Sequence, residues 1–420
     1  MIKETEYKEI FSQVREASRR LLALNDEDRN QVLIALAEMI DGNHETLLAA
    51  NAMDLDKMDR SNPLYDRLQL SHDRLDGIAS DIRNVASLPS PVGEEVEHRI
   101  LPNGIDLRKV RVPFGVIGVI YEARPNVTFD VFSLCFKSGN ACVLKGGRDA
   151  DHSNRAAIEL IHKALEKYKL PECSAVLLPS THEATAALLS ATGYVDVCIP
   201  RGGRKLIDFV RDNARVPVIE TGAGVVHVYI DASADLEMAR GIVENAKTRR
   251  VSVCNALDTL LFHSSRMADL YGIVAPLADK NVQIYADSRA FTVLKDHYPV
   301  DLLHTVDDEA LWDKEWMSYS MGLAIVDSLD EAIAHIAEHG SGHSESIVTE
   351  DMSSAEKFRR MVDASCVYVN LPTSFTDGAQ FGLGAEIGIS TQKLGPRGPM
   401  GLREITTTRY FLTGQGQLRP

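Results

Sequence analysis

The sequence lacks most of the features that mark secreted, membrane and redox proteins. Its six cysteines are spread over 420 residues and include no Cys-x-x-Cys pair, so neither a disulfide framework nor a thiol redox motif is expected. No run approaches the roughly eighteen apolar residues of a membrane span, and the polar first residues do not resemble a signal peptide. We therefore expect a cytoplasmic protein with reduced thiols and no membrane partner.

Positive charge is also scarce. The chain has 45 Lys and Arg residues against 60 Asp and Glu residues, a net charge of −15. Such a chain repels polyanions, so no nucleic-acid partner is expected, although a local cationic pocket could still hold a small anion. The length exceeds what one hydrophobic core usually serves, which predicts at least two domains.

Several catalytic and binding motifs are missing. The sequence has no Gly-x-Gly-x-x-Gly, no Gly-x-Ser-x-Gly, no phosphate-binding P-loop and no His-Glu-x-x-His,. His339 and His343 have the spacing of a metal-binding pair on a helix, but Gly340 and Gly342 argue against a continuous helix there,. We predict no metal site.

The hydrophobic pattern alternates between strands and helices. An apolar stripe from Val32 to Ile40 has helical spacing, and Asn103-Gly104 is typical of a hairpin turn,. Helical patterns such as 153–168 and 203–213 separate the apolar runs, which indicates βαβ units with parallel sheets,. Strands are predicted at 116–120, 141–144, 175–178, 195–199 and 217–219, and again at 259–263, 282–285, 323–326, 346–349 and 367–370.

Three glycine-rich segments follow predicted strands, at 145–147, 201–204 and 221–224. Each alone is best explained as a turn. Open α/β sheets bind ligands at the carboxyl ends of their strands, where a helix N-terminus can receive a phosphate. Three such segments together predict a binding crevice.

Cys254 is the strongest candidate nucleophile. It follows a helical pattern and precedes a predicted strand, with Arg249 and Arg250 close before it. A thiol in a loop beside cationic side chains can have a lowered pKa. A packed core cysteine is the simpler alternative for this residue taken alone, so the assignment depends on other segments.

Those segments resemble the aldehyde dehydrogenase superfamily. The resemblance rests on 113–120, Asn126, 139–145, 220–222 and Cys254. Within the superfamily the chain is similar to the γ-glutamyl phosphate reductases over nearly its whole length, through 121–126, 253–256, 335–345, 381–393 and 397–402. Arg250-Val251 departs from that family, in which Arg-Pro is usual before the cysteine.

The resemblance implies an α/β fold of the aldehyde dehydrogenase type, with two Rossmann-like α/β domains in series and a small β oligomerisation flap. Residues 1–97 and 113–222 would form the cofactor-binding domain and 223–368 the catalytic domain. Residues 369–397 would return to the cofactor domain. The hairpin 98–112 and the strand 398–413 would form the flap of a homodimer or a dimer of dimers.

The resemblance also assigns site residues. It implies Cys254 as nucleophile, with the Asn126 side chain and the Cys254 backbone N–H as oxyanion donors. Glu220 matches the superfamily's general base, but its role stays open between catalysis, thiol activation and structure. The cofactor would contact Lys145, Gly146, Pro179, Gly202, Gly203 and Glu315. The substrate would contact Arg124, His343, Gly382 and Gly384, for which a solvated arginine and a capping histidine are equal alternatives at the first two positions.

The implied activity is NADPH-dependent reduction of L-γ-glutamyl 5-phosphate to L-glutamate 5-semialdehyde through a cysteine thioester, the second step of proline biosynthesis. The cofactor is therefore expected to be NADP(H), with the NADPH-to-NADH preference open. Coupling to glutamate 5-kinase also stays open. An ordinary aldehyde dehydrogenase that uses water, and a silent nucleotide-binding or scaffold protein, are the alternative functions.

Overall fold

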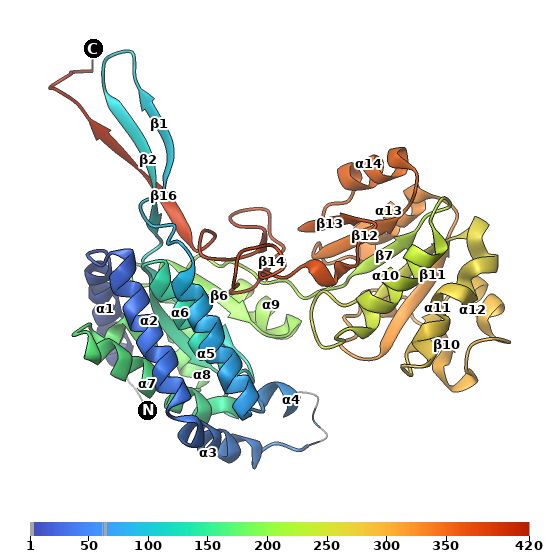
Figure 1. Ribbon diagram of the computed structural model, residues 1–420, viewed down its shortest axis with the longest axis horizontal. Helices are drawn as coiled ribbons and strands as arrows, with labels where there is room; N and C mark the ends of the chain where they lie inside the picture. The colour runs from blue at the N-terminus through green and yellow to red at the C-terminus, as the bar shows by residue number, and fades with distance from the viewer. Residues whose placement is uncertain (1–3, 61, 63–64, 420) are drawn as a thin grey trace. The chain divides into compact units, whose positions relative to one another are not determined.

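The computed structural model describes residues 4–60, 62 and 65–419, which belong to two compact units. The first unit comprises Met1–Thr221, Gly382–Gly388 and Met400–Pro420, and the second comprises Gly222–Phe381 and Ile389–Pro399. Figure 1 shows their helices and strands, most of them labelled. Among the described residues, no helix is long and apolar enough to cross a membrane.

The first unit is built on a four-stranded parallel sheet with the order β5-β4-β3-β6. Its strands are β3 (Val116–Tyr121), β4 (Ala141–Gly146), β5 (Ala175–Leu177) and β6 (Val197–Arg201). All six residues of β3 are buried, which explains its unbroken apolar run,. The chain moves outward from β3 to β5 and then returns to the other side of β3 for β6. The β3/β6 pair is therefore a topological switch point, where open α/β sheets form their ligand crevice.

Helices enclose this sheet. In α2 the predicted stripe from Val32 to Ile40 is buried, and Asn25 and Asp28 form a reciprocal capping box at its start,. The helices of the first unit are α1 (Glu4–Leu21), α2 (Asp26–Asp41), α3 (His44–Leu55), α4 (Tyr65–Leu68), α5 (His72–Ser87), α6 (Asn126–Lys137), α7 (Asp151–Lys167), α8 (His182–Leu189) and α9 (Arg204–Asn213).

A separate three-stranded antiparallel sheet also belongs to the first unit. It consists of β1 (Glu95–Ile100), β2 (Asp106–Pro113) and β16 (Thr406–Thr413), with β2 in the middle. The hairpin of β1 and β2 encloses Asn103-Gly104, as predicted, and eight residues of β16 pair with β2. We call this sheet the flap.

The second unit has a seven-stranded sheet in the order β10-β9-β11-β8-β7-β12-β13, with every pairing parallel. Alternate strand residues enter two cores: Leu260 and Phe262 face the first, and Leu261 faces the second,. The strands are β7 (His227–Ile230), β8 (Thr259–His263), β9 (Gln283–Ala286), β10 (Leu303–Thr305), β11 (Ser320–Val326), β12 (Ser344–Val348) and β13 (Cys366–Val369). The helices are α10 (Leu236–Thr248), α11 (Leu270–Ala278), α12 (Ser288–Leu294), α13 (Leu329–His339) and α14 (Met352–Met361).

The structure differs from the sequence-based expectation in several places. The strand predicted at 217–219 is a single bridge between Val218 and Cys198, and β7 and β10 were not predicted. The boundary between the units falls at Thr221 and Gly222. Of the predicted return segment 369–397, only residues 382–388 pack with the first unit. Gly398-Pro399 forms β15, which pairs with β14 (Ile389–Ser390) in the second unit and not with the flap.

Candidate active site

In the first unit, the candidate residues lie at the carboxyl ends of the strands. The loops that leave β3 and β6 meet at the switch point, where the backbone N–H of Glu122 donates to the carbonyl of Arg201 at 3.2 Å. The Glu122 carboxylate accepts the backbone N–H of Gly203 at 3.1 Å. Gly203 is the N-cap of α9, so an anionic group already lies at the positive end of that helix.

A cationic group lies at the end of β4. Lys145 and Gly146 are the last two residues of the strand, and Arg148 begins the turn that follows. Partial burial lowers the pKa of Lys145, the charge of Arg148 lowers it further, and Glu122 opposes both effects. A Cβ on Gly146 would lie 2.2 Å from Nδ2 of Asn154, so the close packing here requires glycine,. Pro179 follows β5, at the same edge of the sheet.

Asn126 begins α6, directly after the loop that carries Arg124. Its Nδ2 donates a hydrogen bond of 2.8 Å to Oδ2 of Asp130, one turn further along the helix. Burial raises the pKa of Asp130, and the charge of Asp81 on α5 raises it further. The charges of Arg201 at the end of β6 and of Arg124 lower it. The predicted oxyanion donor therefore lies in a charged group of side chains within one unit.

The remaining candidates of the first unit lie in connecting segments. Glu220 is an ion-pair partner of Arg211 at 3.7 Å. Gly382 and Gly384 both have positive φ angles of 74° and 76°, which favour glycine,. The Gly384 carbonyl accepts a hydrogen bond of 2.8 Å from Asn84, so α5 fixes this segment.

In the second unit, the candidates lie at the amino ends of the parallel strands instead. Cys254 is partly exposed in the loop between α10 and β8. Gly224 precedes β7, and its Cα lies so close that a Cβ there would be 1.7 Å from the Cys254 carbonyl oxygen. The Gly224 backbone N–H donates to Oε1 of Glu315 at 3.2 Å. These contacts bring Gly224, Cys254 and Glu315 together within the second unit.

A buried carboxylate connects the same segments. Oδ1 of Asp258 accepts the backbone N–H of Trp316 at 2.8 Å, and Oδ2 accepts that of Val226 at 3.3 Å. Burial raises the pKa of Asp258 and lowers that of nearby Lys247. The Lys247 ammonium, which is fully buried, donates to the carbonyl of Leu257 at 2.8 Å. These charges hold the loop that carries Cys254 against the starts of β7 and β11.

His343 is placed differently from what its predicted role requires. It is fully buried, and Nδ1 bonds to the Ser344 hydroxyl at 2.8 Å. Burial lowers its pKa to about 4, so the imidazole is neutral at physiological pH,. Ser344 in turn bonds to Thr376, whose carbonyl accepts from Asn255 beside Cys254. This position supports a structural role rather than a cationic contact to substrate.

The other five cysteines contrast with Cys254. Cys173 is partly buried, and the remaining four are buried. Burial raises the pKa of Cys198 to about 12. The side-chain hydrogen bond with Cys142, followed by burial, raises the pKa of Cys135 well above its usual value, so these thiols stay protonated. Cys135, Cys142 and Cys198 belong to the hydrophobic core of the first unit.

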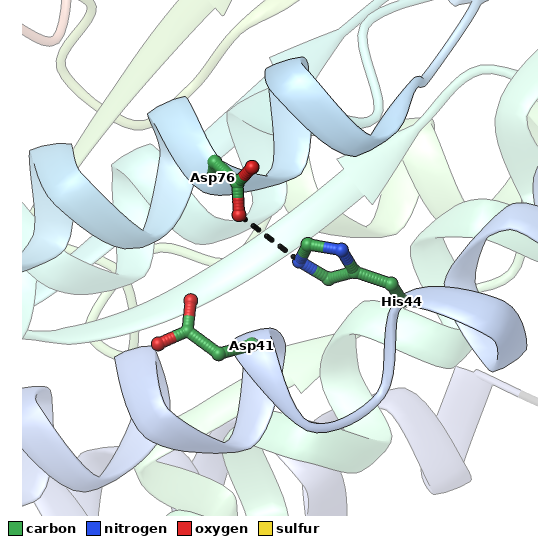
Figure 2. A group of neighbouring side chains, drawn as sticks. All are labelled: Asp41, His44 and Asp76. Carbon is green, nitrogen blue, oxygen red and sulfur yellow. Dashed lines mark ion pairs between the residues drawn. The ribbon is translucent and has the colours of Figure 1, made fainter.

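Figure 2 shows one group of potential metal ligands in the first unit, Asp41, His44 and Asp76. Asp41 forms an ion pair with Arg83, and Nε2 of His44 lies 3.7 Å from Asp76. Nδ1 of His44 lies 3.1 Å from His72. Protein partners therefore account for the charges of this exposed group.

A model of the aldehyde dehydrogenase family matches residues 1–287. The chain belongs to the aldehyde dehydrogenase family. It is 55% identical over 419 residues to the γ-glutamyl phosphate reductase of Pelodictyon phaeoclathratiforme, covering 100% of both chains.

Solved structures are similar to this chain as well. A γ-glutamyl phosphate reductase from Thermotoga maritima superposes with a TM-score of 0.93 at 40% identity, covering 99% of this chain and 100% of the other. An engineered glycolyl-CoA reductase with bound NADP⁺ shares the fold, with a TM-score of 0.70, 18% identity, and coverage of 97% and 96%. The predicted family and fold are confirmed.

Sequence reasoning missed four residues that organise these groups. Arg148, Asp130 and Asp258 have no local motif, and their relevance depends on partners from other elements. Gly224 was noted only as one of a glycine-rich turn. An acidic residue directly before a buried strand, as Asp258 is before β8, was the one available signal.

We expect Gly224→Ala to impair the reaction that depends on Cys254. The new Cβ would meet the Cys254 backbone, which a side-chain rotation cannot relieve. A displacement of about 1 Å costs on the order of 10²-fold in turnover. Steady-state kinetics would measure it, with Gly241→Ala on α10 as control, because a Cβ at Gly241 meets nothing within 4 Å. Wild-type turnover in Gly224→Ala would contradict this account of the loop.

Proposed function

We propose that the protein reduces L-γ-glutamyl 5-phosphate to L-glutamate 5-semialdehyde and phosphate, the second step of proline biosynthesis from glutamate. The observation that carries this proposal is the identity of 55% with a γ-glutamyl phosphate reductase, over 100% of both chains. The local structure supports it, because Cys254 is a partly exposed thiol in a tightly constrained loop.

In this reaction the Cys254 thiolate attacks the acyl carbon of the substrate. The bond to the phosphate oxygen breaks, inorganic phosphate leaves with the bonding electrons, and a thioester remains on the protein. Bound NADPH would supply the hydride that reduces this thioester. Collapse of the reduced adduct expels the thiolate and releases the aldehyde, so the cysteine is regenerated.

The tetrahedral states carry negative charge on the former carbonyl oxygen. By the family resemblance, the side-chain amide of Asn126 and the backbone N–H of Cys254 donate hydrogen bonds to it. Removal of one such donor typically costs ~10²–10³ in rate. Glu220 keeps its open role, and its ion pair with Arg211 favours a structural contribution.

Substrate contacts are proposed for Arg124, Gly382 and Gly384. The two glycines have backbone conformations suited to loops that present N–H groups, and an anion such as the substrate carboxylate would be their ligand,. His343 is omitted from this set because it is buried and neutral.

The residues of the first unit fit a nicotinamide dinucleotide. Gly202 and Gly203 precede α9, whose N-terminus would face the pyrophosphate once the Glu122 carboxylate releases the Gly203 N–H,. Gly146 and Pro179 would line the same crevice. Lys145 and Arg148 place two cations at the end of β4, which favours the additional 2′-phosphate of NADP(H),. In the second unit, Glu315 would contact the nicotinamide ribose, as the family resemblance implies.

The decisive test is the oxidation of glutamate semialdehyde with NADP⁺, with and without inorganic phosphate. A γ-glutamyl phosphate reductase needs phosphate as the acceptor of the acyl group, so turnover should vanish without it. Turnover that is independent of phosphate would instead establish an ordinary aldehyde dehydrogenase, in which water resolves the thioester.

Cys254→Ala is the matched control for this assay. It should have no turnover while NADP⁺ binding, measured by fluorescence titration, persists. Cys173→Ala, which removes another partly buried thiol, should retain activity. If Cys173→Ala lost activity while Cys254→Ala kept it, the assignment of Cys254 as the nucleophile would be wrong.

A second prediction concerns cofactor choice. Arg148→Glu replaces a cation beside Lys145 by an anion, so the preference for NADPH over NADH should fall roughly 10–100-fold, the size of a lost charge-assisted hydrogen bond. The ratio of kcat/KM for the two cofactors measures it. Lys163→Glu, an exposed change on α7, serves as control. An unchanged ratio would remove Arg148 from cofactor selection.

We propose a homodimer or dimer of dimers that works in the cytoplasm. None of the six cysteines, all of which lie in the described part of the chain, forms a disulfide, which suits a reducing compartment,. The flap exposes large apolar side chains, among them Ile100, Tyr410, Phe411 and Leu412. Sheets with exposed apolar surface and open edges are usually covered by another chain.

The double substitution Phe411→Asp and Leu412→Asp should therefore give monomers in sedimentation velocity. Both side chains are exposed, so the fold should persist. Deletion of 400–420 is less informative, because Met400, Leu402 and Ile405 are part of the core. Met352→Asp, an exposed change on α14, is the control. A double variant that keeps the wild-type mass would refute the role of the flap.

A further inference from the structure

Asp130 makes one contact that bears directly on the reaction. Asn126 and Asp130 lie four residues apart on α6, and Nδ2 of Asn126 donates to Oδ2 of Asp130 at 2.8 Å. An ionised carboxylate can only accept hydrogen bonds, whereas a carboxamide has a donor end and an acceptor end. The contact therefore determines which end of the Asn126 carboxamide faces Asp130.

The surroundings of Asp130 place its proton equilibrium near neutral pH. Desolvation is the largest cause and Asp81 on the adjacent helix α5 adds to it, so the pKa of Asp130 rises to about 7. Arg201 at the end of β6, the hydrogen bond from Asn126, and Arg124 before α6 act in the opposite direction. Both protonation states are accessible under physiological conditions.

This arrangement costs stability. Because the pKa of Asp130 is raised in the fold, its ionised form is destabilised there, and the penalty grows as the pH rises from about 4 to about 7,. An asparagine at this position would keep the hydrogen bond without the penalty. A carboxylate is thus explained better by what it does to Asn126 than by what it adds to the fold.

We propose that Asp130 is a positioning residue whose carboxylate holds the Asn126 carboxamide in one of its two flipped orientations. With Nδ2 held, the second N–H of that nitrogen keeps one direction and serves as the oxyanion donor. A protonated Asp130 could donate to Oδ1 of Asn126 and permit the opposite orientation. This inference rests on the proposed function, in which Asn126 is an oxyanion donor.

The test uses the full-length protein and the oxidation of glutamate semialdehyde with NADP⁺ and phosphate. Asp130→Asn should lower kcat roughly 10–100-fold while KM stays within about 2-fold, because the donor acts mainly in the tetrahedral states. The limb of the kcat profile with an apparent pKa near 7 should disappear. Asp301→Asn, an exposed change in the second unit, should leave kcat unchanged.

A double-mutant cycle separates positioning from other roles. In the Asn126→Ala background, Asp130→Asn should have almost no further effect on kcat, because the group through which it acts is gone. The melting temperature of Asp130→Asn should match or exceed that of the wild type, with a larger gain at pH 8 than at pH 5, since the ionised form is the destabilised one.

Three results would overturn the inference. In Asp130→Asn, they are an unchanged kcat and pH profile, or an effect on KM alone. In the double variant, the result is a loss of kcat equal to the product of the losses in Asp130→Asn and Asn126→Ala. An effect on KM alone would make Asp130 a substrate-binding residue. If the wild-type protein itself lacks phosphate-dependent turnover, the proposed function fails first. With an active wild type, these results concern Asp130 only.

Discussion

The loop that carries the candidate nucleophile is fixed by a close backbone contact between Cys254 and Gly224, which leaves no room for a side chain at position 224. The Cys254 carbonyl oxygen lies where a Cβ at residue 224 would be, so the chain entering β7 and the loop entering β8 are in direct contact. Gly224 also donates its N–H to Glu315, which precedes β11. Three segments far apart in the sequence are thereby held together at the amino ends of the parallel strands. The position of the Cys254 thiol depends on that contact.

Buried charged side chains further stabilise the contact between these segments. Asp258 accepts backbone N–H groups from Val226 and Trp316, and Lys247 donates to a carbonyl of the nucleophile loop. A charge removed from water is tolerated only when hydrogen bonds replace its hydration. Backbone groups of neighbouring segments replace the hydration of both side chains, so the loop and its buried charged side chains stabilise one another.

Much of the fold could be predicted because the strands are buried on both faces. The run at 116–120 and the apolar centre of 259–263 match β3 and β8. The segment 217–219 has the same composition but forms one bridge, because only Val218 reaches a partner, Cys198. Strand propensity is thus local, while strand formation needs a neighbour that the sequence does not identify.

The family resemblance was enough to propose Cys254 and Asn126 as site residues, and that assignment stays a prediction. The sequence could not indicate electrostatic interactions between elements that are far apart in the chain. Asp130 looks like a polar residue of an ordinary helix until α5 brings Asp81 and β6 brings Arg201 near it. The burial of His343 could likewise not be predicted, because it depends on how the strands of the second unit pack.

The two units use opposite edges of their parallel sheets, and electrostatics gives a reason. Carboxyl ends of strands lead into helix N-termini, whose positive ends suit phosphates, and the first unit places Gly203 and Arg201 there,. Amino ends follow helix C-termini, whose negative ends suit cations. Cys254 follows the C-terminus of α10, so a thiolate gains nothing from that dipole. Lys247 in the last turn of α10 and Arg249 at its C-cap are cations suited to this helix end, and they lie shortly before the candidate nucleophile,.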